Sequence, residues 1–154
     1  MKRLVVVIAL IWPLLAAAAT PPGVEARGLI NALETAFETK DWTLKSDVTW
    51  PDGRLCFAGG ECIKFSNLNA GGIGIVHKTK FSGWAFATSK DRVICHVMEA
   101  TRTYYDGEFS GLWSVGRARY LIIRRQGEWR ILEKNFLSRR DFGSDTKWQR
   151  KQKR

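Results

Sequence analysis

Long β-prone runs, separated by short Gly-containing pairs, dominate the second half of the chain. The runs cover residues 75–81, 84–88, 92–105, 114–125 and 128–138. The last three are separated by Asp106-Gly107 and by Gln126-Gly127, and pairs of this kind favour the tight turns that join antiparallel neighbours. The pattern therefore predicts an antiparallel meander in which each of these strands pairs with the next.

An amphipathic helix is predicted before this meander. Between residues 24 and 40, apolar side chains recur at helical spacing and charged side chains take the other side. Residues 43–66 are rich in Thr, Val, Trp and Phe around Pro51-Asp52-Gly53, which predicts short strands and hairpins. A chain of 154 residues that is 45% hydrophobic supports one packed core. We expect a single α+β domain, with the N-terminal helix packed on a curved antiparallel β-sheet.

The two ends of the chain differ in composition from this domain. Residues 1–19 begin with two basic residues, continue with about 12 apolar residues and end in four alanines, which is the pattern of a secretory signal peptide. The apolar run is shorter than the roughly 20 residues that cross a bilayer, so a retained membrane span is the weaker alternative. We expect a signal peptide at 1–19, a domain at 20–138 and a basic C-terminal tail at 139–154. The mature protein would be periplasmic or secreted.

The charge is unevenly distributed. The formal net charge of +10 comes from 25 Lys and Arg against 15 Asp and Glu, and the tail contributes seven basic and two acidic residues. Such a tail is either a solvated chain end or an attachment to an anionic phospholipid or polysaccharide surface, and both alternatives stay open. Export argues against nucleic acid as the partner.

The expected export of the protein bears on the state of its cysteines. Cys56 and Cys62 flank a Gly-Gly turn between two short strand-like segments, and an oxidising environment favours a disulfide between them. Cys95 lies in an apolar run and is expected to be a buried, inert thiol, but its pairing with either other cysteine stays open. The chain has two histidines, His77 and His96, and no paired metal-ligand spacing, so we expect no metal site. No cofactor is expected either.

The turn at 126–127 predicts which side chains share a face of the last hairpin. If Arg125 faces Glu128, alternation places Tyr120 opposite Glu133 on the inner face. The same reasoning, applied to the turn at 106–107, adds Glu99 to this face. An apolar face with a few polar groups is typical of a ligand pocket. The predicted pocket residues are Tyr120, Glu133, Asn135, Glu99 and Trp129.

Three of these residues are candidates for acid–base catalysis. Glu99 and Glu133 would form a carboxylate pair in which one pKa is raised, with Tyr120 as a hydrogen-bond donor. The alternative is that each carboxylate lies at the rim and is paired with an arginine.

The other face of the hairpin is expected to reach solvent. Arg119 would lie opposite Lys134, and water screens such a repulsion whereas a dry core does not. The predicted basic surface consists of Arg117, Arg119, Arg130, Lys134, Arg139 and Arg140.

The order of elements and the closing hairpin resemble a known fold. A helix, short strands and a long meander follow one another, and the last turn reads Gly127-Glu128-Trp129-Arg130-Ile131. This resembles the cystatin-like cone of the nuclear-transport-factor-two-like superfamily, which includes the polyketide-cyclase type, over residues 24–138. The resemblance implies a cone-like domain with a pocket, and a homodimer. Enzymes of the superfamily usually place Asp and His together in the cone, whereas no histidine falls on the inner face predicted here.

Three functional hypotheses result. The first is an exported binding or assembly protein whose pocket takes a small hydrophobic ligand, without a recognisable catalytic set. The second is a cofactor-free lyase or isomerase that uses a pocket carboxylate. The third is a protein that binds anionic lipid or polysaccharide through its basic surface.

Overall fold

The computed structural model describes residues 22–68 and 75–143. The predicted signal peptide at 1–19 lies outside the described residues, as does the part of the tail from residue 144 onward. Within the two described segments, no helix is long and apolar enough to cross a membrane.

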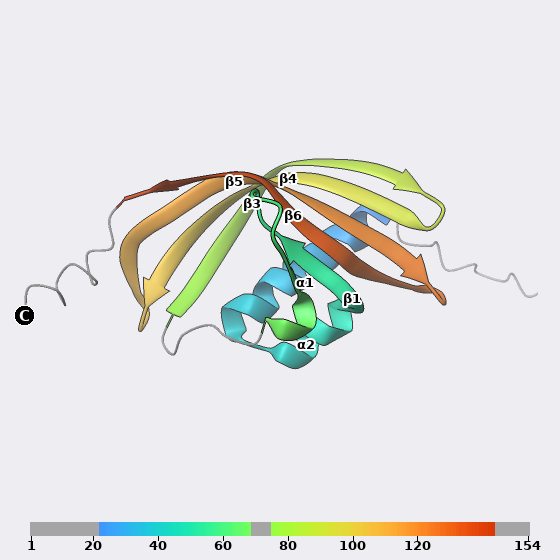
Figure 1. The fold of residues 1–154 in the computed structure, drawn as a ribbon, viewed down its shortest axis with the longest axis horizontal. Coiled ribbons are helices and arrows are strands. Elements are labelled where there is room, and N and C mark those ends of the chain that lie inside the picture. The colour runs from blue at the N-terminus through green and yellow to red at the C-terminus, as the bar shows by residue number, and fades with distance from the viewer. Residues whose placement is uncertain (1–21, 69–74, 144–154) are drawn as a thin grey trace, which may run out of the picture.

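Two helices lie under the concave face of a curved six-stranded sheet (Figure 1). The elements are α1 Pro22–Thr39, α2 Trp42–Val48, β1 Thr49–Cys56, β2 Cys62–Lys64, the 3-10 helix η1 Phe65–Asn67, β3 Ile75–Ser89, β4 Arg92–Tyr105, β5 Glu108–Arg125 and β6 Glu128–Phe142. The strand order is β2-β1-β6-β5-β4-β3, and all neighbours are antiparallel except β1 and β6. The predicted α+β class and the curved, mainly antiparallel sheet are confirmed.

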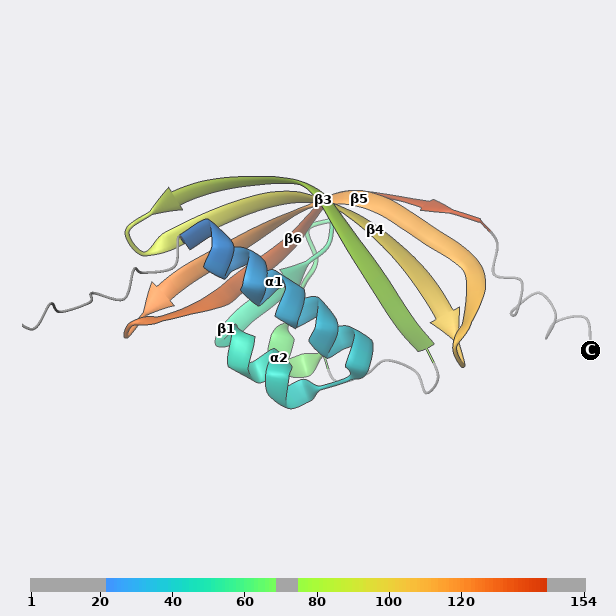
Figure 2. The ribbon, with the colours of Figure 1, turned by 180° about the vertical axis from the view of Figure 1, so that it is seen from behind.

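Helix α1 runs along the concave side of the sheet (Figure 2), and its apolar stripe packs against the inner face. Ala26, Ile30 and Leu33 are completely or almost completely buried, and their spacing of three to four residues places them on one side of the helix. They belong to one core cluster with buried residues of the sheet, namely Val93, Cys95, Val97, Ala118, Tyr120, Ile122 and Ile131. Since all of these strand residues alternate with exposed or half-buried neighbours, the inner face of the sheet is clearly defined.

The prediction of strands and hairpins directly after α1 is wrong, because helix α2 lies there. The Asp41 side chain caps α2 by accepting a hydrogen bond from the Leu44 N–H at 2.9 Å. The Lys45 ammonium is buried and donates to the carbonyls of Phe65 and Leu68 at 2.8 and 3.1 Å. A helix of seven residues shows too little periodicity to be recognised in sequence, and such contacts from elsewhere in the chain stabilise it.

Other predicted boundaries also shift. Residues 51–53, predicted as a turn, lie inside β1, and the two short candidates after residue 75 form the single strand β3, which is irregular around Gly83 (φ 62°). Strand β6 continues to Phe142, so Arg139 and Arg140 belong to the sheet rather than to the tail.

Both predicted tight turns are confirmed. Asp106 and Gly107 have φ angles of 50° and 85°, and Gln126 and Gly127 have 53° and 86°. Positive φ at both central residues is the signature of the hairpin turn that matches the natural twist of paired strands. The turns place β4, β5 and β6 side by side.

Candidate functional site

A bulge in the last hairpin changes the predicted pairing. Ile122 pairs with Ile131 as predicted, but Tyr120 lies opposite Lys134 rather than Glu133, because β6 carries one extra residue between these two pairs. Side chains alternate along a strand, so a shift of one residue exchanges the faces of everything beyond it.

Because of the bulge, Glu133, Lys134 and Asn135 of β6 lie on the faces opposite to those predicted. Lys134, predicted on the basic outer surface, is buried with only 3% of its surface exposed. Glu133 and Asn135, predicted in the pocket, lie on the side opposite Tyr120. The predicted pair of Glu99 and Glu133 carboxylates is therefore wrong.

A cavity of about 330 Å³ lies between the helices and the inner face of the sheet. Its apolar wall is formed mainly by Phe37, Trp42, Leu55, Phe57, Leu68 and Phe136. Glu34, Glu99 and Lys134 line the cavity as well. The volume is at the lower end of the range for small-molecule sites, roughly 300–1,000 Å³.

The polar end of the cavity is a connected group of four side chains, Glu34, Glu99, Tyr120 and Lys134, which we call the polar cluster. Lys134 Nζ lies 2.5 Å from Oε1 of Glu34 and 3.1 Å from Oε1 of Glu99. The Tyr120 hydroxyl lies 2.6 Å from Oε1 of Glu99 and 3.3 Å from Oε1 of Glu34. Tyr120 is completely buried and is not part of the cavity lining, so it positions Glu99 rather than touching a ligand.

Two members of the polar cluster were not predicted. Glu34 follows Ile30 by four residues, which places it at the border of the apolar stripe of α1, and this spacing is the signal that could have indicated it. Lys134 has no comparable signal, because its position depends on the bulge. Its partner Glu34 is 100 residues away in the chain.

Burial and charge determine the protonation of the cluster. Burial raises the pKa of Glu99, and the neighbouring Glu34 carboxylate adds to this effect, although Lys134 opposes it. Burial lowers the pKa of Lys134, but the Glu34 and Glu99 carboxylates outweigh it, so this pKa is raised. Burial and the same carboxylates raise the pKa of Tyr120. These shifts favour the ammonium form of Lys134 and the neutral, hydrogen-bond-donating form of Tyr120.

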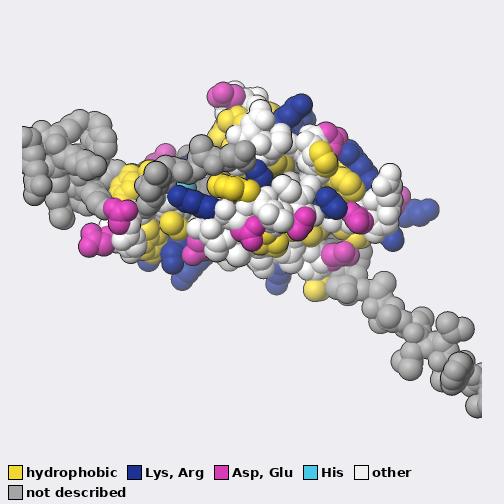
Figure 3. Space-filling view, turned by 90° about the horizontal axis from the view of Figure 1, so that it is seen from below, with side chains coloured by type: hydrophobic (Ala, Val, Ile, Leu, Met, Phe, Trp, Pro, Cys, Tyr) yellow, Lys and Arg dark blue, Asp and Glu magenta, His cyan; other side chains and the backbone are white. Residues whose placement is uncertain are grey.

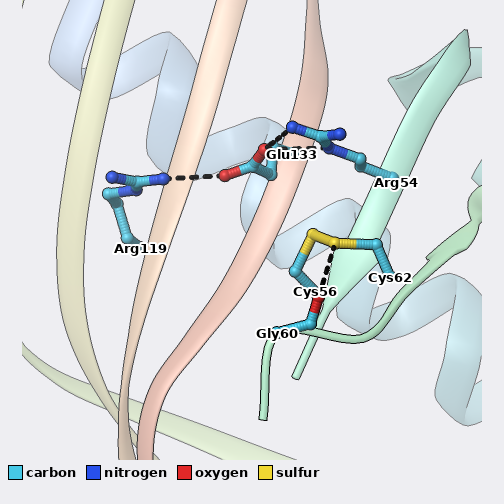
Figure 4. A network of polar contacts seen from close by, with 6 residues as sticks. All are labelled: Arg54, Cys56, Gly60, Cys62, Arg119 and Glu133. Carbon is cyan, nitrogen blue, oxygen red and sulfur yellow. Dashed lines mark hydrogen bonds and ion pairs between the residues drawn. A yellow bond between two sulfur atoms is a disulfide. The ribbon is translucent and has the colours of Figure 1, made fainter. Parts of the chain in front are cut away.

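Glu133 forms a separate site on the other side of the sheet. Figure 4 shows its carboxylate between the guanidinium groups of Arg54 and Arg119, at 2.9 and 2.7 Å. Burial alone would raise the pKa of Glu133, but hydrogen bonds and charge from the two arginines outweigh it and lower the pKa. A carboxylate held in its ionised form in this way is poorly suited to act as a general acid.

The disulfide predicted between Cys56 and Cys62 is present, beside this arginine pair (Figure 4). It joins the end of β1 to β2 and closes the turn that carries Phe57, one of the cavity-lining residues. Cys95 is a free, buried thiol whose pKa is raised by burial to about 12, so it is unreactive near neutral pH. Among residues 22–68 and 75–143, no cluster of His, Cys, Asp and Glu is arranged to hold a metal ion.

The remaining predicted site residues have other contacts. Trp129 packs against the core cluster and is absent from the cavity lining. On the predicted basic surface, Arg119, Arg130 and Arg139 pair with Glu133, Glu128 and Asp141. The opposite, helix side of the molecule, seen from below in Figure 3, also carries interspersed basic and acidic side chains. Charge is therefore less concentrated than the sequence predicted.

Comparison with solved structures identifies the fold. A nuclear-transport-factor-2 (NTF2)-like protein from Cytophaga hutchinsonii superposes with a TM-score of 0.66 at 15% identity, over 77% of this chain and 99% of that one. An NTF2-like protein with a cystatin-like fold from Novosphingobium aromaticivorans gives 0.58 at 18% identity, over 73% and 79%. The β subunit of benzoate 1,2-dioxygenase from Burkholderia mallei gives 0.60 at 12% identity, over 73% and 87%.

These matches confirm the predicted resemblance: the chain has the NTF2-like, cystatin-like cone fold. No protein-family model matches the sequence, and no curated protein does. The likeness to solved structures concerns the fold alone, since this architecture hosts many unrelated activities.

Proposed function

We propose that this protein binds one small molecule with an apolar body and a polar end in the cavity between its helices and its sheet. The observation that carries the proposal is the cavity itself, whose aromatic and aliphatic wall ends at the carboxylates of Glu34 and Glu99 and the ammonium of Lys134. Apolar walls with a few convergent polar groups are typical of ligand sites.

We further propose that the protein is exported. The segment at 1–19 has the composition of a signal peptide, and the Cys56–Cys62 disulfide is consistent with an oxidising compartment. The proposed role is that of a periplasmic or secreted binding or assembly protein.

Native mass spectrometry of the protein, produced in a host with an export pathway, tests binding. We expect added mass from a retained small molecule that is lost in Thr101→Trp, which places an indole in the cavity lining. Thr88→Trp is the matched control, because Thr88 is exposed on β3 and does not line the cavity. Equal ligand occupancy in the two variants, or an empty wild type that also binds no apolar dye, would contradict the proposal. The same spectra report signal cleavage and whether the protein is the homodimer that the resemblance implies.

A second candidate is a cofactor-free lyase or isomerase, and the environment of Glu99 favours it. Its pKa is raised mainly by burial, and its Oε1 accepts a hydrogen bond from Tyr120, as in a carboxyl group poised for proton transfer. Turnover of the retained molecule that Glu99→Gln abolishes without unfolding the protein would establish this activity. A rate independent of pH across the carboxyl range would exclude it.

The third hypothesis is the binding of an anionic lipid or polysaccharide to the basic surface. Arg117 and Arg140 still belong to this surface, whereas Lys134 is buried in the interior. The hypothesis predicts binding to anionic vesicles that falls steeply with added salt. In 0.5 M salt the Debye length is roughly half of its value at physiological salt, so unchanged binding there would exclude this hypothesis.

A further inference from the structure

Glu34 and Glu99 line the cavity, and each has one carboxylate oxygen that receives no hydrogen bond from the described residues. Among the described residues, every hydrogen bond to Glu34 and Glu99 goes to Oε1, from Lys134 or Tyr120. No hydrogen bond within this part of the chain reaches Oε2 of either carboxylate. A carboxylate can accept at both oxygens, so two acceptors on the cavity wall are available to a bound donor.

The charges of the cluster are also unequal. One ammonium, that of Lys134, faces two carboxylates, and the Tyr120 phenol is neutral. With both carboxylates ionised the cluster carries a formal net charge of −1, in a region where Lys134 and Glu99 expose at most about 5% of their side chains. An uncompensated buried charge is costly, and it is relieved either by a proton on Glu99, whose pKa is raised, or by a second cation.

The other charged or titratable groups of the lining are Lys40, His77 and Arg139. Lys40 lies just after α1, and the stretch of helix from Glu34 to Thr39 alone spans roughly 7.5 Å. His77 pairs with Thr103, four residues or roughly 13 Å along β4 from Glu99, and burial lowers its pKa toward the neutral form. The charge of Arg139 is balanced by Asp141 at 2.8 Å. The negative end of the cavity is therefore at the polar cluster.

Aromatic rings border this negative end. Phe37 lies one turn of α1 beyond Glu34, and the ring of Phe136 lies next to Lys134, with 4.8 Å between its centroid and Nζ. Ring faces attract cations, and the rest of the wall is apolar.

We propose, on the basis of the ligand-binding function above, that the ligand is a small amine with an aromatic or branched apolar body. Its protonated nitrogen donates hydrogen bonds to Oε2 of Glu34 and Glu99, and its apolar body contacts Phe37, Trp42 and Phe136. Charge-assisted hydrogen bonds from a second cation complete the pairing that Lys134 begins.

A panel of matched compounds tests this assignment by isothermal titration calorimetry on the full-length protein. Phenyl, cyclohexyl and indolyl bodies are each compared with an ethylamine, an ethanol and an acetate head group. For at least one body we expect the amine to bind about tenfold or more tightly than the alcohol, and the acetate to bind least. An alcohol or acetate that equals or exceeds its amine for every body would overturn the assignment but leave the binding function intact.

Variants separate the carboxylates from general packing. Glu34→Gln, at the more exposed end of the cluster, is expected to reduce the amine preference by about tenfold while alcohol binding changes little. Glu99→Gln is the second test, and Glu133→Gln, on the opposite side of the sheet, is the control that should retain the preference. An amine preference that survives both cluster variants would overturn the assignment. Failure of the whole panel would do so as well, and combined with an empty native spectrum it would also overturn the proposed binding function.

Discussion

Replacing Lys134 with methionine should destabilise the protein more than any substitution of a surface lysine. The Lys134 ammonium pairs with the carboxylates of both Glu34 and Glu99 and is almost inaccessible to water. Removing one partner of a buried ion pair costs about 3–5 kcal/mol, because the remaining charge is buried without compensation. Glu34 retains 14% exposure of its side chain at the cavity and can be hydrated, so we expect the lower end of this range.

The expected loss is therefore about 3 kcal/mol of unfolding free energy at neutral pH, or a decrease in Tm of roughly 10 °C. The loss should shrink as the pH falls toward the ordinary carboxyl range. Without the ammonium, which opposes the effect of burial, the pKa of Glu99 in the folded state rises further above that of the unfolded chain. The folded variant then binds more protons than the unfolded chain, which stabilises it at lower pH.

Urea unfolding followed by tryptophan fluorescence, with the disulfide intact, measures this effect. Lys80→Met is the matched control, because Lys80 is exposed on β3, and it should lie within about 0.5 kcal/mol of the wild type. Adding Glu34→Gln and Glu99→Gln to Lys134→Met should restore much of the loss by removing the unpaired charges. The reasoning is refuted if Lys134→Met unfolds at the same urea concentration as the wild type at pH 7, or if the triple variant is no more stable than the single one.

Three other regions allow sharp tests by the same unfolding assay. Burial raises the pKa of Glu133 less than its two arginine partners lower it, so Glu133→Gln should lose about 1 kcal/mol at pH 7. That deficit should vanish as the pH falls below the ordinary Glu pKa of 4.5; a deficit constant with pH would exclude the ion pairs as its cause. Changing Cys56 and Cys62 together to serine should cost about 2 kcal/mol, and a variant as stable as the disulfide-bonded wild type would contradict the contribution of the disulfide. Gly116→Ala should cost about 2 kcal/mol, since its Cβ would overlap a backbone carbonyl oxygen of β6. Gly28→Ala, in an open helical position, should instead add about 0.5 kcal/mol or more of stability. Equal effects of the two substitutions would refute the close approach at β6.

Local chemistry explains what could be predicted of the fold. The pairs at 106–107 and 126–127 adopt positive φ, as their composition favours, and they join the strands as expected. The stripe of α1 is buried because its helical spacing places it on one side, and the Cys56–Cys62 disulfide follows from a short Gly-containing turn. Each of these features depends on residues that are neighbours in sequence.

The candidate site depended on features that were not local. Helix α2 is too short to show periodicity, and the parallel pairing of β1 with β6 joins segments from opposite halves of the chain. The predicted register of the last hairpin is correct from the turn to the pair Ile122 and Ile131, where the bulge begins. Tyr120 and Glu133 lie beyond this pair and do not face each other. Beyond that point Glu133, Lys134 and Asn135 of β6 lie on the faces opposite to those predicted, whereas Tyr120 and Glu99 lie on the inner face as predicted.

The sequence by itself determined the α+β class, the turns, the helix stripe and the disulfide, because short-range spacing and backbone preference specify them. Only the tertiary structure decided that Lys134 faces inward and Glu133 outward, since a single extra residue in β6 exchanges the two faces. A buried lysine is stable only with carboxylates around it, and Glu34 and Glu99 come from α1 and β4, far from β6 in the chain. The polar end of the cavity, and with it the proposed ligand chemistry, therefore exists only in the folded molecule.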